Sequence, residues 1–220
     1  MIVVKNVYKR YTTRLGVGDW VLKDINLVIP KNVSVGIVGA NGAGKSTLLR
    51  IIGGADYASF GTVERRCRVS WPMGNGGVEA TMTGRQNAKF ICRLYGFEKD
   101  MNDRIRRIEE FAEIGVAFDR PVNTYSSGMR SRLQFALSLA FEFDVYISDE
   151  VTSAGDASFK AKAEKAFKDL AGKSSIIMVA HNDSTLKKFC QSGIFLYKGR
   201  AVWYDQIDDA LVAYRETIKV

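Results

Sequence analysis

The chain has 220 residues, and its 32 Lys and Arg against 24 Asp and Glu give a formal net charge of +8. Apolar residues make up 46% and charged residues 25%, a balance that excludes an intrinsically disordered chain. No apolar run approaches the roughly 18 residues of a transmembrane helix, and the first residues lack the apolar stretch of a signal peptide. We therefore expect a single-domain protein that resides in the cytoplasm.

The sparse cysteine and histidine content excludes several kinds of site. Cys67, Cys92 and Cys190 are widely spaced and form no CxxC pair, which is typical of reduced, packed thiols rather than of a disulfide framework or a zinc site. His181 is the one histidine of the chain, so a site built from several histidines is also excluded.

The first half of the chain predicts a strand followed directly by a helix. Residues 33–38 form a β-branched run that stops at Gly39, which indicates a buried strand. A helix follows from Lys45 and ends at the paired glycines Gly53 and Gly54.

The middle of the chain is predicted to be helical. Thr83 and Gln86 form a possible capping box that opens a helix ending near Gly96. A second amphipathic helix is expected from Met101, closed by Gly115.

The last third alternates strand and helix. Residues 145–148 and 174–180 resemble strands and flank a helical stretch of about 158–171. Residues 194–197 and 201–204 predict a hairpin followed by a short helix. This βαβ alternation predicts an α/β fold with a mainly parallel sheet and helices on both faces.

The sequence GANGAGKS, residues 39–46, matches the GxxxxGK[ST] phosphate loop between its strand and its helix. The glycines let successive backbone N–H groups point at phosphate oxygens, and the helix N-terminus adds partial positive charge. Lys45 is expected to reach the β and γ phosphates, and the Ser46 hydroxyl to ligate Mg²⁺. The predicted nucleotide-binding residues here are Gly39, Asn41, Gly42, Gly44, Lys45, Ser46 and Thr47.

Two acidic residues follow a later strand and indicate which reaction the phosphate loop serves. Asp149 and Glu150 end the apolar run 145–148, which places carboxylates at the C-terminal edge of the sheet beside the phosphates. Asp149 suits Mg²⁺ coordination, and Glu150 suits polarising the attacking water. A phosphate loop alone leaves kinases, GTPases, motors and transport ATPases open, so further motifs must decide among them.

Further segments resemble motifs of one family, the ATP-binding-cassette (ABC) proteins. YSSGMR, residues 125–130, resembles the signature LSGGQ in the degenerate form of polysaccharide exporters. DEVTSAGD, residues 149–156, is similar to the family's Walker B motif and D-loop, and His181 stands where the family has its switch histidine. Together with the phosphate loop these motifs follow the family's order and cover essentially the whole chain.

The resemblance implies a P-loop NTPase of the ABC cassette type. Residues 1–220 would form one ABC ATP-binding domain, with antiparallel β elements at its N-terminal end and a helical subdomain, roughly residues 80–140, inserted in its core. Two copies would form a head-to-tail homodimer that sandwiches ATP between one phosphate loop and the partner's signature residues Ser126, Ser127 and Gly128. Ser126 would also cap its own helix.

The resemblance also assigns roles to two aromatic side chains. His181 would hydrogen-bond the γ-phosphate and orient the water with Glu150, so the expected catalytic residues are Lys45, Glu150 and His181. Tyr11 occupies the place of the aromatic residue that stacks on adenine. An exposed strand-edge aromatic is the alternative, and Tyr8 is close enough to compete for the role.

Departures from the family pattern point to a subfamily. The stretch 68–77 contains no glutamine to act as the Q-loop residue, and Val151 and Gly155 replace the usual proline and leucine. SWPMGNGG resembles the corresponding segment of capsular-polysaccharide export ATPases. We also expect no C-terminal carbohydrate-recognition domain, so a membrane partner would select the substrate.

These observations predict an ATPase that powers export of a polysaccharide, with a capsular polysaccharide as first choice, through a separate permease. It would be a peripheral protein on the cytoplasmic face of the inner membrane. O-antigen and teichoic-acid exporters remain alternatives. A nucleic-acid-associated ABC ATPase would also explain the basic charge, but the coiled coil of repair proteins and the tandem cassettes of translation factors do not fit, so no nucleic-acid partner is expected.

The basic charge is concentrated in one stretch. Residues 60–107 contain ten basic and five acidic side chains, a net charge of +5. We expect this charge on the helical subdomain, held against an anionic cytoplasmic membrane surface. A solvated charged face is the alternative.

Overall fold

The computed structural model of the chain describes every residue except 15, 74–76, 150–156, 181 and 219–220. The chain divides into two compact units. The core unit comprises Met1–Pro72, Phe143–Glu150 and Ala171–Val220, and the helical unit comprises Met73–Glu142 and Val151–Leu170. Each unit is described by itself.

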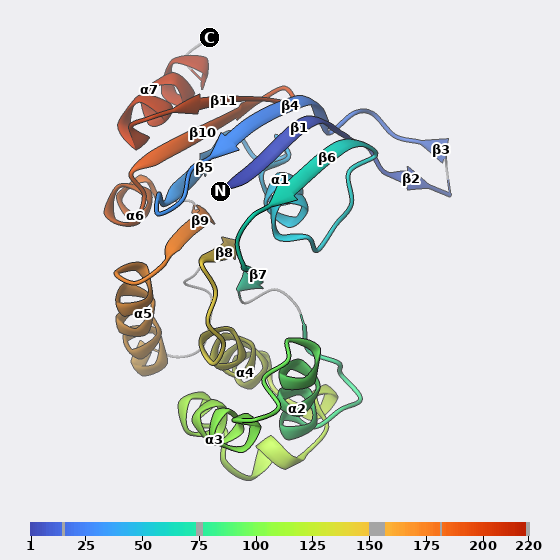
Figure 1. The fold of residues 1–220 in the computed structure, drawn as a ribbon, viewed down its shortest axis with the longest axis vertical. Helices are drawn as coiled ribbons and strands as arrows, with labels where there is room; N and C mark the ends of the chain where they lie inside the picture. Colours follow the sequence, from blue (N-terminus) through green and yellow to red (C-terminus); the bar gives the residue numbers. More distant parts are fainter. Residues whose placement is uncertain (15, 74–76, 150–156, 181, 219–220) are drawn as a thin grey trace. The chain divides into compact units, whose positions relative to one another are not determined.

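The core unit contains a three-stranded antiparallel sheet in the order β4-β1-β6 (Figure 1). Its strands are β1 (Ile2–Lys9), β4 (Leu22–Ile29) and β6 (Phe60–Arg65). Between β1 and β4 the chain forms the short pair β2 (Thr12–Thr13) and β3 (Gly16–Val17). These are the antiparallel elements that the sequence predicts near the N-terminus.

The second sheet of the core unit has the order β11-β10-β5-β9-β8-β7. Strands β10, β5, β9 and β8 run parallel, and β11 pairs antiparallel with β10. The predicted mainly parallel sheet and the C-terminal hairpin are therefore confirmed. The strands are β5 (Val35–Val38), β7 (Val69–Met73), β8 (Val145–Asp149), β9 (Ser175–Val179), β10 (Ser192–Tyr197) and β11 (Arg200–Tyr204).

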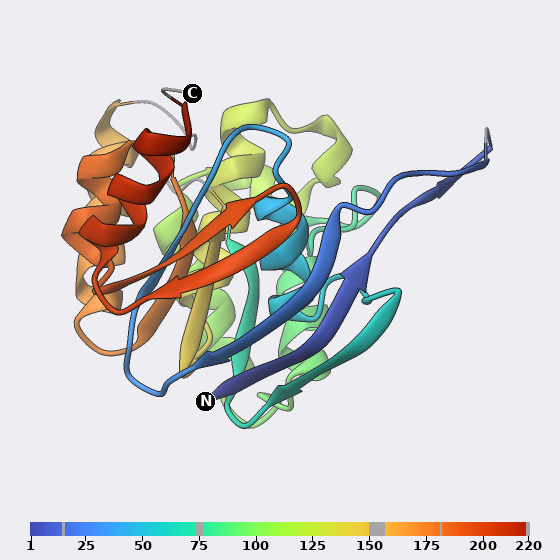
Figure 2. The ribbon, with the colours of Figure 1, turned by 90° about the horizontal axis from the view of Figure 1, so that it is seen from above.

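Helices cover both faces of this sheet (Figure 2). Helix α1 (Lys45–Gly53) lies between the two sheets, and its buried face joins one apolar cluster with β1, β4, β5, β8, β9 and β10. Helices α6 (Asp183–Phe189) and α7 (Ile207–Ile218) pack on the other face. Gly193 permits this approach, because a Cβ atom there would collide with the Cβ atom of Ala210.

The helical unit contains α2 (Gly84–Leu94), α3 (Met101–Ala112), α4 (Ser127–Leu139) and most of α5 (Ala157–Ala171). Two 3₁₀ turns, Gly115–Asp119 and Val122–Thr124, connect α3 to α4. The predicted capping box is confirmed, because the Thr83 hydroxyl accepts from the Gln86 backbone N–H while the Gln86 side chain accepts from the Thr83 N–H.

One predicted helix end is wrong. Helix α3 ends at Ala112, and Glu113 takes the left-handed conformation directly after it, with φ 51°, two residues before Gly115. Glu113 is fixed there by contacts distant in sequence, since its carboxylate pairs with Lys162 at 2.6 Å. Gly115 instead opens the following 3₁₀ turn.

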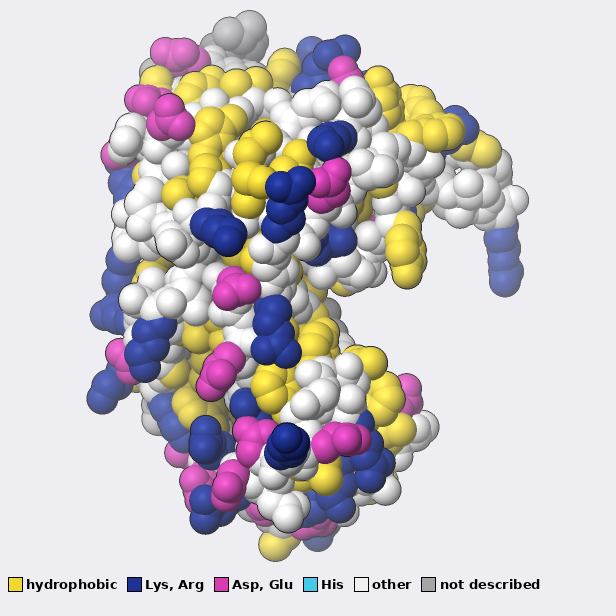
Figure 3. Space-filling model, viewed as in Figure 1, with side chains coloured by type: hydrophobic (Ala, Val, Ile, Leu, Met, Phe, Trp, Pro, Cys, Tyr) yellow, Lys and Arg dark blue, Asp and Glu magenta, His cyan; other side chains and the backbone are white. Residues whose placement is uncertain are grey.

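The predicted concentration of basic charge on the helical subdomain is also wrong. Arg65, Arg66 and Arg68 belong to the core unit, and the Arg65 guanidinium donates to the carbonyls of Ile51 and Ile52 at the end of α1. On the visible face of the helical unit, basic and acidic side chains intermingle (Figure 3). Among the described residues no helix is long and apolar enough to cross a membrane.

Candidate functional site

The loop between β5 and α1 depends on glycine at defined positions. Gly39 has φ 154°, and a Cβ atom there would collide with the carbonyl oxygen of Leu196. Gly44 has φ 101° and lies against Val21. Gly42 has φ 78° with open space where a side chain would be. The loop conformation is thus set by the backbone and by the strand beside it.

Lys45 is the first residue of α1, and its side chain folds back over this loop. Its Nζ donates to the carbonyl oxygens of Gly39 at 2.7 Å and Ala40 at 2.9 Å. Burial lowers the pKa of Lys45, and the nearby negative charge of Asp149 partly opposes that shift. The Lys45 ammonium is therefore held against the loop. No side chain caps the N-terminus of α1, so its backbone N–H groups are not covered by a capping side chain. Both features suit phosphate.

Asp149 lies at the same edge of the sheet. It ends β8, pairs in register with Val179 of β9, and β9 pairs with β5. Because parallel strands end at one edge, Asp149 and the loop after β5 share that edge, as predicted. Ser46 and Thr47 follow Lys45 in the first turn of α1. Glu150 and His181 lie outside the described residues, so their roles remain predictions.

A small pocket of about 60 Å³ opens beside the loop. Gly39, Asn41 and Lys45 line it, so it contains part of the predicted site. Asp183 and Tyr214 also line it, and sequence reasoning did not single them out. The remaining lining residues are Ile37, Val38, Ala180 and Leu186. Asp183 has a local signal, since it begins α6 directly after the capping residue Asn182.

Tyr11 lies near α1, not at an isolated strand edge. Its hydroxyl donates to Asp56 Oδ2 at 2.9 Å and lies 3.3 Å from the hydroxyl of Thr47. The Lys9 ammonium stands 4.6 Å from the ring centroid, and 38% of the residue remains exposed. Sequence reasoning missed Lys9 and Asp56, which carry no local motif.

The signature residues belong to the helical unit. Ser126 caps α4, because its hydroxyl accepts from the Met129 backbone N–H at 3.2 Å, as predicted. Ser126 and Ser127 are exposed. At Gly128 a Cβ atom would meet nothing nearer than 3.9 Å, so the surface at this helix end is open.

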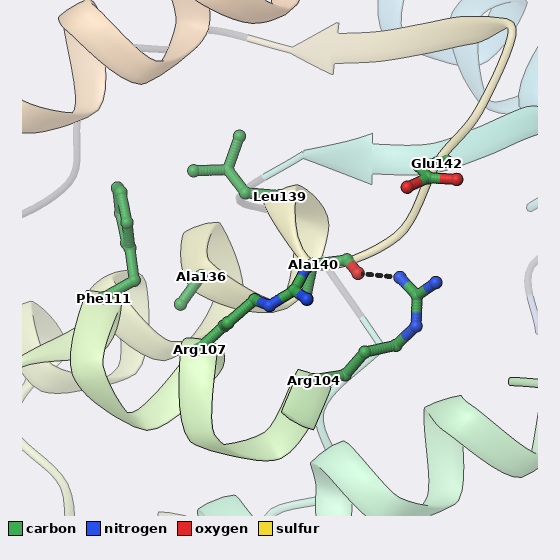
Figure 4. A pocket seen from close by; sticks show the side chains of 7 residues that line it. All are labelled: Arg104, Arg107, Phe111, Ala136, Leu139, Ala140 and Glu142. Atoms are coloured by element: carbon green, nitrogen blue, oxygen red, sulfur yellow. Dashed lines mark hydrogen bonds between the residues drawn. The ribbon is translucent and has the colours of Figure 1, made fainter. Parts of the chain in front are cut away.

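A second pocket, in the helical unit, contains none of the predicted site residues. It measures about 180 Å³ and lies between α3 and α4 (Figure 4). The buried Arg104 donates to the carbonyl oxygen of Ala140 and pairs with Asp100 at 2.8 Å. The other residues that line the pocket are Arg107, Phe111, Ala136, Leu139 and Glu142. Arg104 therefore serves to join the end of α4 to α3.

Comparison with known proteins identifies the family. The family model described as "ABC transporter" matches residues 22–153. The chain belongs to the ABC transporter family. The predicted resemblance and the predicted fold class, a P-loop NTPase of the ABC cassette type, are thus confirmed.

Relatives of this ABC protein match along almost its entire length. It is 44% identical over 220 residues to the polysialic acid transport ATP-binding protein KpsT of Escherichia coli, covering 99% of this chain and 100% of KpsT. It is 42% identical to the capsule polysaccharide export ATP-binding protein CtrD of Neisseria meningitidis, covering 97% and 98% of the two chains.

A solved ABC cassette has the same fold. The ATP-binding cassette MJ0796, in a dimeric post-hydrolysis state bound to ADP and Pi, superposes with a TM-score of 0.75 at 23% identity. The match covers 94% of this chain and 99% of that one. At this identity the likeness establishes the fold.

Proposed function

We propose that this ABC protein is the ATP-binding and ATP-hydrolysing subunit of a transporter that exports a polysaccharide, with a capsular polysaccharide as the substrate class. One observation carries the nucleotide part: Lys45 lies over a phosphate loop whose glycines admit no side chain at Gly39, at the sheet edge that also holds Asp149. The substrate class follows the names of relatives that match along nearly the full chain.

In this proposal the phosphate loop and the first turn of α1 bind the nucleotide. Backbone N–H groups of the loop and of the first turn of α1 would bind the phosphates, and the Lys45 ammonium would neutralise charge on the β and γ phosphates. Tyr11 offers its ring to the adenine. The bound nucleotide lies between the loop and a partner subunit.

The donor set fits a magnesium ion that arrives with the nucleotide. Among the described residues no three His, Cys, Asp or Glu side chains form a cluster for a metal. Mg²⁺ commonly binds through one or two protein oxygens plus substrate phosphates, and Ser46 and Asp149 supply that number. The ion would offset charge on the phosphates, while Glu150 orients the attacking water and His181 contacts the γ-phosphate.

The complete site requires a second copy of the chain. Ser126, Ser127 and Gly128 lie at the exposed N-terminus of α4 and would contact the γ-phosphate bound by the partner subunit. A symmetric homodimer then has two equivalent sites. We further propose that residues 1–220 act as one ABC domain on the cytoplasmic face of the inner membrane, bound to permease subunits that carry the polysaccharide path.

The nucleotide part is tested by measuring phosphate release from ATP by the purified chain. Lys45→Ala is expected to lower the rate by at least ~100-fold, because a preorganised charge at the transferred phosphate is lost. Lys31→Ala removes an exposed lysine and serves as the control. Glu150→Gln is expected to accumulate an ATP-bound dimer in size-exclusion chromatography. Wild-type rates in Lys45→Ala and Glu150→Gln would contradict the proposal.

The transport part is tested by purifying the protein from solubilised membranes and identifying what remains bound. A six-helix permease of a polysaccharide exporter is the expected partner. Recovery with an importer that depends on a periplasmic binding protein would refute export while leaving the nucleotide chemistry intact.

A further inference from the structure

The Tyr11 side chain is held at its hydroxyl end by three residues of the core unit. The hydroxyl donates to Asp56 Oδ2 at 2.9 Å, and it lies 3.3 Å from Thr47 Oγ1 and 3.4 Å from Arg50 Nη2. Thr47 and Arg50 lie one turn apart on α1. The tyrosine that follows β1 is therefore tied to the helix that begins at the phosphate loop.

Asp56 reaches this position because α1 stops abruptly. Gly54 has φ 78°, and the chain then turns back so that the backbone N–H groups of Ala55 and Asp56 donate to the carbonyl of Arg50 at 2.9 and 3.3 Å. This C-terminal turn carries Asp56 to the end of β1.

Lys9 fixes Asp56 from the other side. Its Nζ donates to Asp56 Oδ1 and to the carbonyl oxygen of Tyr57, both at 2.7 Å. The Lys9 and Asp56 side chains are 10% and 22% exposed, so this pair is more shielded from solvent than most surface ion pairs. Asp56 Oδ1 also accepts from the Tyr57 backbone N–H at 2.7 Å, so one carboxylate oxygen binds Lys9 and Tyr57 while the other binds Tyr11.

The ionisation of Asp56 sets the direction of the hydrogen bonds at the Tyr11 hydroxyl. Burial by itself would raise the pKa of Asp56, but hydrogen bonds from Lys9 and Tyr11 outweigh it, and the pKa lies below its usual value. The ionised carboxylate can only accept, so the Tyr11 proton points at it. The Tyr11 oxygen must then accept from Arg50 and Thr47.

We propose that Asp56, held by Lys9, is a positioning residue for nucleotide binding: it fixes the Tyr11 ring in the orientation that receives the base. The inference rests on the proposed function. Nucleotide phosphates would compete for the Thr47 hydroxyl, whereas the Asp56 carboxylate, held by Lys9 and by the Tyr57 backbone N–H, keeps its bond to Tyr11. A ring oriented before the ligand arrives loses less conformational freedom on binding.

The test compares two probes by isothermal titration calorimetry on the full chain: ATP with Mg²⁺, and inorganic tripolyphosphate with Mg²⁺, which has no base. Asp56→Ala is expected to weaken ATP binding about ten-fold and to change tripolyphosphate binding less than about two-fold. Asp56→Asn keeps an oxygen acceptor, so its loss of ATP affinity is expected to be smaller. The ATPase kcat at saturating ATP should stay constant while KM rises.

Two further variants control the result. Glu64→Ala removes an exposed carboxylate that pairs with Lys5 on the same sheet, and it should leave both affinities unchanged. Tyr11→Phe keeps the ring and removes the donor, so it should weaken ATP binding selectively even where Asp56→Ala does not fold. In the Tyr11→Phe background, Asp56→Ala should cost no further ATP affinity.

The outcomes separate this inference from the proposed function. Equal losses of ATP and tripolyphosphate affinity, or additive losses in the double variant, would overturn the positioning role. Unchanged ATP affinity in both Asp56→Ala and Tyr11→Phe would overturn it while the proposed function stands. A wild-type chain that binds neither probe overturns both.

Discussion

The core unit and the helical unit differ in the side chains that fill their interiors, which are mainly aliphatic in the core cluster and include packed aromatic rings in the helical unit. The core unit is built on an apolar cluster that joins α1 to two sheets, and glycines such as Gly39 and Gly193 let backbone segments approach closely. In the helical unit, Phe111, Phe135 and Phe159 pack against one another, and arginines that lie over other rings also bind carboxylates. Arg85 lies over Phe118 and pairs with Asp119 and Glu109, and Arg104 lies over Phe97 and pairs with Asp100.

The difference shows where each unit is vulnerable. In the core unit the loop that faces the proposed phosphates is fixed by main-chain geometry, so a single added carbon at Gly39 has no room. In the helical unit, Arg85 and Arg104 each bind more than one partner in addition to the packing of the aromatic rings, so the loss of one charged group removes several contacts together. The following experiments challenge this contrast, from the largest expected effect to the smallest.

Gly39→Ala is expected to destabilise the core unit by about 3 kcal/mol, because the new Cβ atom collides with the Leu196 carbonyl oxygen. Gly42→Ala is the matched control, since its φ of 78° costs about 1 kcal/mol but its side chain meets nothing. Urea unfolding followed by tryptophan fluorescence measures both, because Trp20, Trp71 and Trp203 all belong to the core unit. Equal urea midpoints for Gly39→Ala and Gly42→Ala would show that the close approach of Gly39 to the Leu196 carbonyl oxygen does not limit stability.

Arg104→Met is expected to destabilise the helical unit by about 2 kcal/mol, because the Ala140 carbonyl and Asp100 both lose their donor while a side chain of similar length remains. Arg106→Met is the control. Arg106 pairs with Asp103, but both side chains are more than half exposed, so the expected loss is about 0.5 kcal/mol or less. Thermal melts followed by far-UV circular dichroism compare the two variants. Similar losses of stability would show that the buried Arg104 contributes no more than the exposed Arg106.

The smallest expected effect is a dependence of the stability of the helical unit on pH. The hydrogen bond from Arg85 holds the pKa of Asp119 below its usual value, against the opposing effect of burial. Because the folded-state pKa is lowered, the stabilisation is present above the unfolded pKa of about 4 and is lost as the pH falls through the folded pKa. The difference in melting temperature between wild type and Arg85→Met should therefore be largest near pH 7 and shrink as the pH falls below about 4. A constant gap between these pH values would show that the Arg85 contribution is not ionic.

Short-range signals account for what the sequence predicted well. The phosphate loop, the end of α1 at Gly54, the Thr83 capping box and the Ser126 cap each depend on residues within a few positions of one another. Their geometry follows from local backbone and side-chain hydrogen bonds, so a sequence pattern suffices to find them. The alternation of apolar runs likewise predicted the parallel sheet.

Contacts between distant residues account for what the sequence missed. Asp56 meets Tyr11 across 45 positions, and Arg65 binds carbonyls at the end of α1 rather than contributing to the helical unit. Glu113 ends α3 in a left-handed conformation while paired with Lys162, 49 positions away. None of these residues lies in a recognisable motif, since the partner that gives each its role is supplied by the fold.

The sequence by itself determined the family and the order of the motifs, and it predicted which residues face a phosphate, because those features are encoded in contiguous segments with fixed spacing. Only the tertiary structure decided how the excess charge divides between the units and which side chains hold Tyr11 against α1. The physical reason is that charge placement and side-chain orientation depend on which surfaces meet after strands pair and helices pack. That information is distributed over the whole chain.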